Sequence, residues 1–190
     1  MGFENPPYEL LESDGHIELR QYDNYIVAEV TLTGSFEGVL SQGFRILADY
    51  IFGNNRRSEH IAMTVPVIEQ PRPASEKIAM TAPVVTEDLG ASTFKVAFMM
   101  PSKYTLETLP QALDERITFR IVPAHMAAAT RFSGSMGAES AMKHRDELEH
   151  WVNTHGLSVI SPFTYANYSP PWIPPFLRRN EVIVDVERVK

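Results

Sequence analysis

The sequence predicts an α+β fold, in which a distorted antiparallel β-barrel of about eight or nine strands carries two helices. Segments with the alternation of strands outnumber helical ones, and each of the two helical segments follows a pair of strands. Parts of the chain also recur at an offset of 100 residues; Ile17-Glu18-Leu19-Arg20, for example, resembles Ile117-Thr118-Phe119-Arg120. We therefore expect one domain over residues 1–190, built from pseudo-symmetric half-repeats at about residues 8–100 and 115–190.

The first half begins with two strands and a helix. Ile17–Tyr22 alternates apolar and polar residues, and Tyr25–Thr33 is rich in β-branched residues, which favours strands. Over Phe36–Phe52 the apolar residues return with helical period and gather on one side. Gly53-Asn54-Asn55 follows, and these residue types tolerate the left-handed conformation with which many helices end.

A phrase of the form IAMT-x-PV occurs twice in the middle of the chain, and its second copy begins 17 residues after the first. Both copies carry alternating apolar residues and predict strands, at Ile61–Ile68 and Ile78–Val85. The polar, proline-containing segment Glu69–Glu76 between them predicts a hairpin loop. A further strand is predicted at Thr93–Met100.

The second half repeats the order of the first. Arg116–Val122 and His125–Phe132 predict two strands. Ala138–Thr154 predicts a helix whose polar side carries oppositely charged residues four positions apart. Near the end of the chain, strands are predicted at Phe163–Tyr168 and Glu181–Val189.

The segment Ser169–Pro175 contains four prolines and cannot form a helix or a central strand, because proline lacks an N–H donor and fixes φ. Together with Trp172, Ile173 and Phe176 it makes a stiff apolar arm. This arm either closes over a ligand site or plugs one end of the barrel.

The composition limits the possible functions. With 17 Lys and Arg against 24 Asp and Glu, the formal charge is −7, so nucleic-acid binding is not expected. The chain has no cysteine, which excludes disulfides, thiolate metal sites and a cysteine nucleophile. No apolar run is long enough to span a membrane, and the start of the chain does not resemble a signal peptide, so we expect a cytoplasmic protein.

The sequence contains no familiar catalytic or metal-binding signature. G-x-S-x-G and glycine-rich phosphate loops do not occur, and the six histidines lack the spacing of HExxH or other zinc sites. We therefore assign no catalytic residue and no set of metal ligands.

Several motifs resemble those of one protein family over nearly the whole chain. They are the two IAMT-x-PV copies, IELRQY (Ile17–Tyr22), the helix end Tyr50–Asn55, FMMPSKY (Phe98–Tyr104) and YSPPWIPPFLRRNEV (Tyr168–Val182). On these residues the chain is similar to the SOUL/heme-binding protein family. The resemblance implies a barrel with two helices, an architecture also found in bacterial gyrase-inhibitor-like effector-binding domains. It further implies non-covalent, non-enzymatic binding of heme, a related tetrapyrrole or another planar hydrophobic molecule, in a shallow apolar site beside the first helix.

The resemblance is carried over residue by residue. Basic side chains that meet the heme propionates in relatives correspond to Ser41, Asp49 and Ile173, so those charges are missing, and only Arg45 can substitute. A histidine proposed as axial ligand in animal members corresponds to Gln21, which is a poor iron ligand. Apolar helix positions complete the implied cofactor site: Ser41, Phe44, Arg45, Ala48, Asp49, Phe52 and Ile173. His60 is added as a candidate because it precedes the first IAMT copy, from where it could approach the first helix, and because histidine is the commonest heme ligand type.

Alternatives stay open for several residues. Period 2 favours burial of Met63 and Met80 in the core, whereas their thioethers could also ligate a heme iron. The protein could instead be an effector-binding module that holds a small molecule in the cleft between the halves. As a third alternative, it could hydrolyse small molecules with a cleft carboxylate, for which Glu29 and Glu181 are the candidates. A structural ion pair is the favoured interpretation of Glu181, because Arg178-Arg179-Asn180 precede it.

Overall fold

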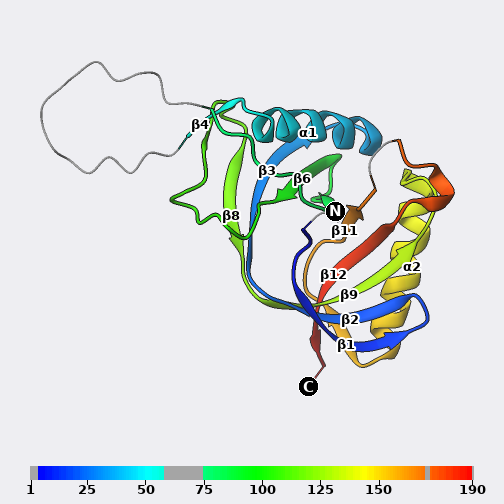
Figure 1. The fold of residues 1–190 in the computed structure, drawn as a ribbon. Helices are drawn as coiled ribbons and strands as arrows, with labels where there is room; N and C mark the ends of the chain where they lie inside the picture. The colour runs from blue at the N-terminus through cyan, green and yellow to red at the C-terminus, as the bar shows by residue number, and fades with distance from the viewer. Residues whose placement is uncertain (1–3, 58–74, 170–171, 190) are drawn as a thin grey trace, which may run out of the picture.

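The computed structural model describes residues 4–57, 75–169 and 172–189, and Figure 1 shows their arrangement. Two helices lie against an antiparallel sheet that curls into a half-barrel. This confirms the predicted α+β class, with two helices on a distorted antiparallel barrel. The helices are α1 (Phe36–Ile51) and α2 (Ala138–Thr154), as their apolar periods predicted to within one residue at either end.

Short and medium strands make up most of the remaining structure, together with one turn of 3-10 helix, η1 (Pro175–Leu177). The described strands are β1 (Tyr8–Asp14), β2 (Ile17–Tyr22), β3 (Tyr25–Thr33), β4 (Asn55–Arg56), β5 (Val84–Asp88), β6 (Thr93–Met99), β7 (Gln111–Ala112), β8 (Thr118–Val122), β9 (His125–Phe132), β10 (Leu157–Val159), β11 (Thr164–Asn167) and β12 (Asn180–Arg188).

One large sheet contains all of these strands except β4 and β7, which pair with each other. Its order is β1-β2-β9-β12-β11-β5-β6-β3-β8, and β10 pairs with β12. Strand β2 pairs with β9 and strand β3 pairs with β8, so the continuous segment β2–β3 runs alongside the segment β8–β9. Tyr22 lies opposite His125, and Tyr25 lies opposite Val122. Strands from the first and second halves of the chain thus share one continuous sheet.

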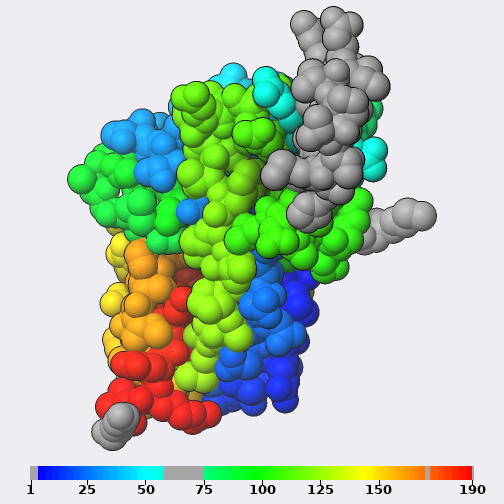
Figure 2. Space-filling model, turned by 90° about the vertical axis from the view of Figure 1, so that its left-hand side faces the viewer, coloured from blue at the N-terminus to red at the C-terminus, as the bar shows by residue number. Residues whose placement is uncertain are grey.

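The two ends of the large sheet, β1 and β8, are edge strands. Figure 2 shows the face on which β8 lies, where the yellow-green chain runs down the surface between the blue N-terminal and the red C-terminal segments. Ile121 on β8 is 49% exposed there. No helix among the described residues has the length and the apolar character needed to cross a membrane.

Helix α1 packs on β3 and β6. Its N-terminus is capped by Ser35, whose hydroxyl accepts a hydrogen bond from the backbone N–H of Gly38 at 3.3 Å. In the middle of the helix, Gly43 faces Val96 of β6, and a Cβ added to Gly43 would lie 2.6 Å from the Val96 Cβ. The glycine therefore allows the helix to approach the sheet closely, which places the next residue, Phe44, at the edge of the helix–sheet contact.

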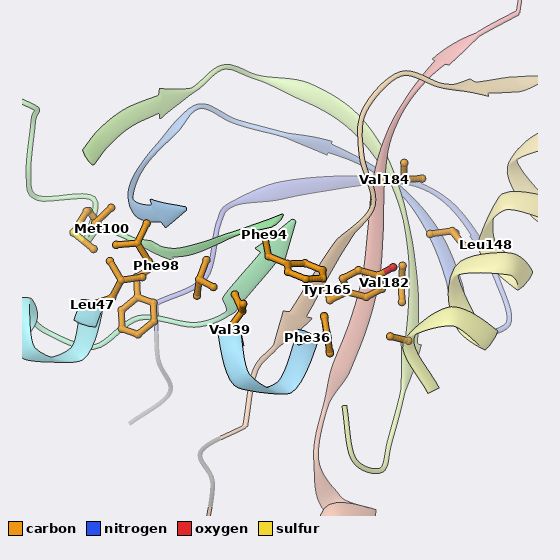
Figure 3. Packing of buried hydrophobic residues seen from close by; sticks show 14 of the residues in the cluster. Phe36, Val39, Leu47, Phe94, Phe98, Met100, Leu148, Tyr165, Val182 and Val184 are labelled. Carbon is orange, nitrogen blue, oxygen red and sulfur yellow. The ribbon is translucent and has the colours of Figure 1, made fainter. Parts of the chain in front are cut away.

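The apolar core runs from α1 through the sheet to α2 (Figure 3). Phe36, at the start of α1, packs edge-on against Phe94 and Tyr165, with ring centroids 5.8 and 5.3 Å apart. Val182 on β12 and Leu148 on α2 are fully buried and continue the core under the second helix. Helix α2 covers β9, β10 and β12.

The sequence-based prediction was wrong for one strand and missed others. Ile78–Val85 is not a strand; β5 begins only at Val84, after Pro83, which has no N–H for a sheet. The N–H of Ile78 instead bonds to the carbonyl of Ile51 at 2.8 Å. Strands β1, β4, β7 and β10 were not predicted, and the predicted strand Ile61–Ile68 lies outside the described residues.

Candidate functional site

A groove of about 410 Å³ lies beside α1. Side chains of α1 form one wall, the segment before β5 forms a second, and the end of β11 with the proline-rich arm (residues 169–178, described except for 170 and 171) forms the third. The lining residues are Glu37, Leu40, Ser41, Phe44, Arg45, Met80, Thr81, Ala82, Val84, Met136, Asn167, Tyr168, Ser169, Trp172 and Arg178.

The helix wall combines an apolar ring with a cation. Phe44 is half-buried, and its ring lies 5.5 Å from that of Phe98, so one edge belongs to the core and the other faces the groove. Arg45 follows it and is exposed. Among the described residues, the Arg45 guanidinium has no hydrogen-bonded or ion-paired partner. It is therefore available for an anionic group of a ligand.

The second wall is fixed by hydrogen bonds of its backbone and of one threonine. The hydroxyl of Thr81 donates to the carbonyl of Met99 on β6. The N–H of Ala82 donates to the carbonyl of Glu4 at 3.0 Å. These bonds hold Met80, which is half-buried, with its side chain at the groove.

Three parts of the chain meet at the end of the groove near the start of α1. A carboxylate oxygen of Glu37 accepts the N–H of Ala138 at 3.1 Å, so α1 caps the N-terminus of α2, which has no side-chain cap of its own. The N–H of Gly134 donates to the carbonyl of Pro175 in the arm at 2.9 Å. The loop between these two contacts places Met136 in the groove lining.

The arm is tied down where it starts and where it ends. The N–H of Arg179 donates to the hydroxyl of Ser169 at 2.9 Å, and the N–H of Tyr168 donates to the carbonyl of Arg179 at 3.1 Å. Within the arm, Arg178 Nε donates to the carbonyl of Ile173 at 2.7 Å. Trp172 lines the groove although 76% of its surface is exposed.

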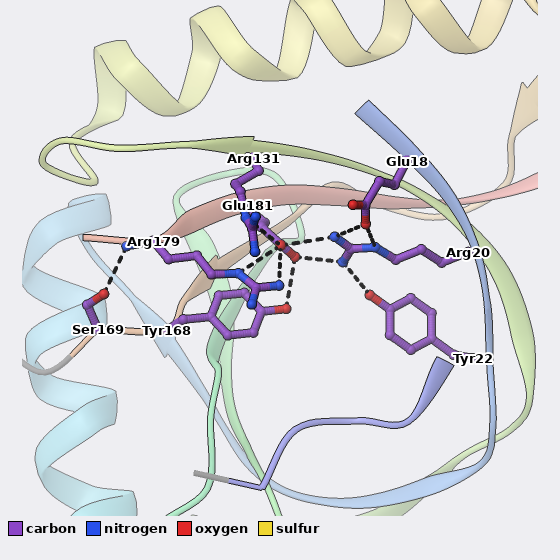
Figure 4. Close-up of polar contacts among 8 residues, drawn as sticks. All are labelled: Glu18, Arg20, Tyr22, Arg131, Tyr168, Ser169, Arg179 and Glu181. Atoms are coloured by element: carbon purple, nitrogen blue, oxygen red, sulfur yellow. Dashed lines mark hydrogen bonds and ion pairs between the residues drawn. The ribbon is translucent and has the colours of Figure 1, made fainter. Parts of the chain in front are cut away.

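A charged network lies beneath the arm, and Figure 4 shows its members. Glu181 on β12 has no exposed surface. Its carboxylate accepts hydrogen bonds from Arg20 at 2.7 and 3.0 Å, from Arg179 at 2.7 Å and from the hydroxyl of Tyr168 at 2.8 Å. Burial alone would raise the pKa of Glu181, but the two arginines outweigh it and leave the pKa lowered. Glu181 is thus held as an anion in structural ion pairs, as its sequence context predicted.

The other carboxylate considered for catalysis is also ion-paired. Glu29 on β3 is 8% exposed. It lies 3.1 Å from Arg120 and 3.8 Å from Lys95. Arg120 and Lys95 both line a second, smaller cavity of about 130 Å³ between the two halves. Its lining also includes Tyr22 and His125.

The family model of the SOUL heme-binding protein matches residues 3–76 and 68–185. The chain belongs to the SOUL family. Heme-binding protein 1 of Xenopus laevis is 25% identical over 173 residues, which cover 90% of this chain and 84% of that protein.

Solved structures share the fold of this SOUL protein at low sequence identity. The C-terminal domain of EcmrR superposes on this chain with a TM-score of 0.65 at 13% identity. The match covers 96% of this chain and 99% of the EcmrR domain. A structure described as a hydrolase from Listeria innocua has a TM-score of 0.59 at 12% identity, covering 93% of this chain and 94% of that one. At these identities the likeness concerns the fold alone.

The residues that the sequence analysis predicted for the site fall into three groups. Ser41, Phe44 and Arg45 line the groove. Ala48, Asp49 and Phe52 do not. Ala48 is buried on the core side, and Asp49 accepts a hydrogen bond from the Asn54 side chain. Phe52 is the exposed C-cap residue that follows α1. Of the remaining two, Ile173 lies in the arm beside Trp172, and His60 lies outside the described residues.

Sequence reasoning missed most of the groove lining, and Met136 and Tyr168 show why. Met136 follows a Gly-Ser break before α2, and Tyr168 follows the short strand β11, so neither position carries a local signal for a site. Both reach the groove only through contacts with distant segments. Among the described residues, no histidine lines the groove, and no cluster of His, Asp or Glu has the arrangement of a metal site.

Proposed function

We propose that this protein binds heme or a related tetrapyrrole, non-covalently and without catalysing a reaction, in the groove beside α1. Membership of the SOUL heme-binding family supports the ligand class. The groove itself carries the proposal: it combines apolar walls with an exposed, unpaired cation among the described residues, at the helix that the family resemblance implied. A flat apolar molecule with carboxylate groups needs this combination.

The residues of the groove fit such a molecule. Its volume of about 410 Å³ lies within the range of about 300–1,000 Å³ that is common for cofactor sites. Phe44, Met80, Met136 and Trp172 offer apolar surface to a macrocycle, and Arg45 can meet a propionate. Heme would supply a coloured, redox-active iron when bound. The groove contains two thioethers, those of Met80 and Met136, of a type that can ligate a heme iron.

The arm is preorganised for binding. Prolines limit its conformations, and the hydrogen bonds at Ser169, Arg178 and Arg179 fix where it starts and ends. Binding therefore costs little ordering of the arm, so that more of the contact energy of Trp172 remains as affinity.

The cavity between the halves supports a second candidate, the effector-binding module. Tyrosine rings line it together with charged groups such as Asp185, and the EcmrR domain shares the fold. A cavity of about 130 Å³ admits only a small molecule, because drug-sized ligands occupy at least about 300 Å³. The hydrolase alternative is less well supported, because Glu29 and Glu181 are both engaged in ion pairs.

A hemin titration with a matched pair of arm variants tests the proposal. Trp172 and Phe176 are both exposed aromatic residues of the arm, at 76% and 73%, but only Trp172 lines the groove. Trp172→Ala should weaken hemin binding roughly tenfold, since it removes a large apolar contact, whereas Phe176→Ala should leave it unchanged. Saturable changes in visible absorption measure the affinity. Absence of such changes in the wild type contradicts the proposal, and equal effects of the two variants move the site elsewhere.

A further inference from the structure

Tyr168 is the one side chain shared by the linings of the groove beside α1 and of the smaller cavity between the halves. It stands where β11 ends and the arm begins, so its ring forms part of the groove floor while its hydroxyl points into the charged network (Figure 4). The hydroxyl donates to Glu181 at 2.8 Å, and the guanidinium of Arg179 covers the ring at 4.1 Å from its centroid. Burial raises the pKa of Tyr168 well above its usual range, and the charge of Glu181 adds to this effect, so the hydroxyl stays a donor.

Glu181 holds both ends of the arm at once. Through Tyr168 it fixes the residue that precedes the arm, and through Arg179 it fixes the residue that follows it. Arg20 on β2, itself only 1% exposed, anchors Glu181 to the rest of the sheet through two hydrogen bonds. The bond from the Tyr168 N–H to the Arg179 carbonyl and the bond from the Arg179 N–H to the Ser169 hydroxyl complete a closed set of contacts.

We propose that Glu181 is a positioning residue of the groove: by fixing Tyr168 and Arg179 it sets where the arm holds Trp172 relative to α1. The inference rests on the proposed function for its effect on ligand affinity, but its structural part, the position of Trp172, does not depend on any ligand. Glu181 reaches the ligand only through other side chains. It therefore acts by shaping the groove before binding.

The sheet offers a matched comparison for this role. Arg20 is hydrogen-bonded to two carboxylates, Glu181 and Glu18, the latter at 2.7 Å. Glu18 has no contact with the arm among the interactions of the described residues, and its side chain is partly exposed. If the network only stabilised the sheet, replacing either carboxylate would have the same effect on the order of Trp172 and on ligand affinity. A positioning role predicts an effect from Glu181 alone.

The test compares Tyr168→Phe, Glu181→Gln and Glu18→Gln in a Trp151→Phe background, where Trp172 is the single tryptophan left. Fluorescence anisotropy of Trp172 without ligand reports the order of the arm, and hemin titration reports affinity. Tyr168→Phe and Glu181→Gln should lower the anisotropy and weaken hemin binding about threefold to tenfold, as the net loss of one typical hydrogen bond implies. Glu18→Gln should change neither.

Each outcome decides one claim. Tyr168→Phe removes a single hydroxyl, so it keeps the test valid if Glu181→Gln does not fold. Unchanged anisotropy in Tyr168→Phe overturns the positioning role. Lowered anisotropy with unchanged affinity, in a protein that binds hemin, overturns its effect on the ligand. Equal effects of Glu18→Gln and Glu181→Gln also overturn the positioning role. A wild-type protein that does not bind hemin contradicts the proposed function alone, and the anisotropy then still decides whether Glu181 fixes the arm.

Discussion

The groove beside α1 and the charged network beneath the arm share the side chain of Tyr168 but satisfy their polar groups in opposite ways. In the network, the Glu181 carboxylate is buried and bonded to two arginines and a tyrosine. In the groove, Arg45 is exposed without a partner among the described residues, and Trp172 is largely exposed. Buried polar groups whose hydrogen bonds are satisfied indicate a structural role, whereas an unpaired cation beside exposed apolar surface indicates a ligand site.

This difference has an energetic basis. A buried ion pair gains little over a well-packed apolar alternative, but removal of one partner leaves an uncompensated charge in the interior. Substitutions in the network should therefore mainly lower the stability of the protein, and substitutions in the groove should mainly lower its affinity for the ligand. Variants in each region can break or sharpen that division.

The largest effect is expected for Arg20→Met. Arg20 is 1% exposed, and its loss leaves the buried carboxylate of Glu181 without two hydrogen bonds. We expect a loss of about 3–5 kcal/mol in the free energy of unfolding, measured by urea denaturation. Arg145→Met is the control, because Arg145 pairs with Asp146 at the surface, and it should cost less than about 1 kcal/mol. Similar losses in both variants would show that the network is no more structural than a surface pair.

A smaller effect, on affinity instead of stability, is expected for Arg45→Glu. The substitution reverses the charge that faces the groove and should weaken hemin binding roughly fivefold at low salt, with less effect as salt screens the charges. Gln42→Glu adds a negative charge to the same exposed stretch of α1 at a position outside the groove lining, and should leave binding nearly unchanged. Equal weakening by both variants would mean that only the net charge of the protein matters.

The same two regions show what local sequence can and cannot predict. The bounds of α1 follow from its apolar period, whereas Phe44 and Arg45 were assigned to the site through the family resemblance, and both line the groove. All seven residues of β1 are exposed, so it carries no alternation of buried and exposed positions that could have predicted it. Ile78–Val85 has the alternation of a strand, but Pro83 and the bonds of Ile78 and Ala82 to other segments prevent one.

The network required knowledge of the tertiary structure. Arg20 and Glu181 are 161 residues apart and meet because β2 and β12 both flank β9. The sequence predicted only the local part of this arrangement, the ion pair between Glu181 and the arginines just before it. Tyr168 and Met136 likewise enter the groove through contacts between distant segments, which no periodicity records.

A subtler effect is expected for Met80→Leu. Leucine keeps the volume and apolar character of the wall, so that stability and hemin affinity should change little, by about threefold at most. If the Met80 thioether ligates the iron, however, the visible spectrum of the bound heme should change, most clearly in the ferrous state. Met142→Leu serves as the control, because Met142 is 54% exposed on α2 and does not line the groove. Identical spectra of wild type and Met80→Leu would exclude this thioether as a ligand.

The smallest effect concerns pH and an ion-paired carboxylate outside both regions. Glu147 on α2 accepts hydrogen bonds from His16 at 2.8 Å and from His144 at 3.2 Å. Burial would raise the pKa of Glu147, but these bonds outweigh it and leave the pKa lowered. Because the folded pKa lies below the ordinary value of 4.5, the stabilisation is present above about pH 4.5 and is lost as the pH falls through the lowered pKa.

The stability difference between wild type and Glu147→Gln should therefore be less than about 1 kcal/mol at pH 6 and should vanish in acid, since the side chains are partly exposed. Unfolding by urea across this pH range measures it. His16→Gln completes a double-mutant cycle, in which the coupling between His16 and Glu147 should disappear together with the pH dependence. A coupling that persists after Glu147 is protonated would mean that packing, and not charge, joins the β1–β2 turn to α2. The contact of Glu147 would then differ from that of Glu181 in its physical cause as well as in its strength, because Glu181 is held as an anion by two arginines.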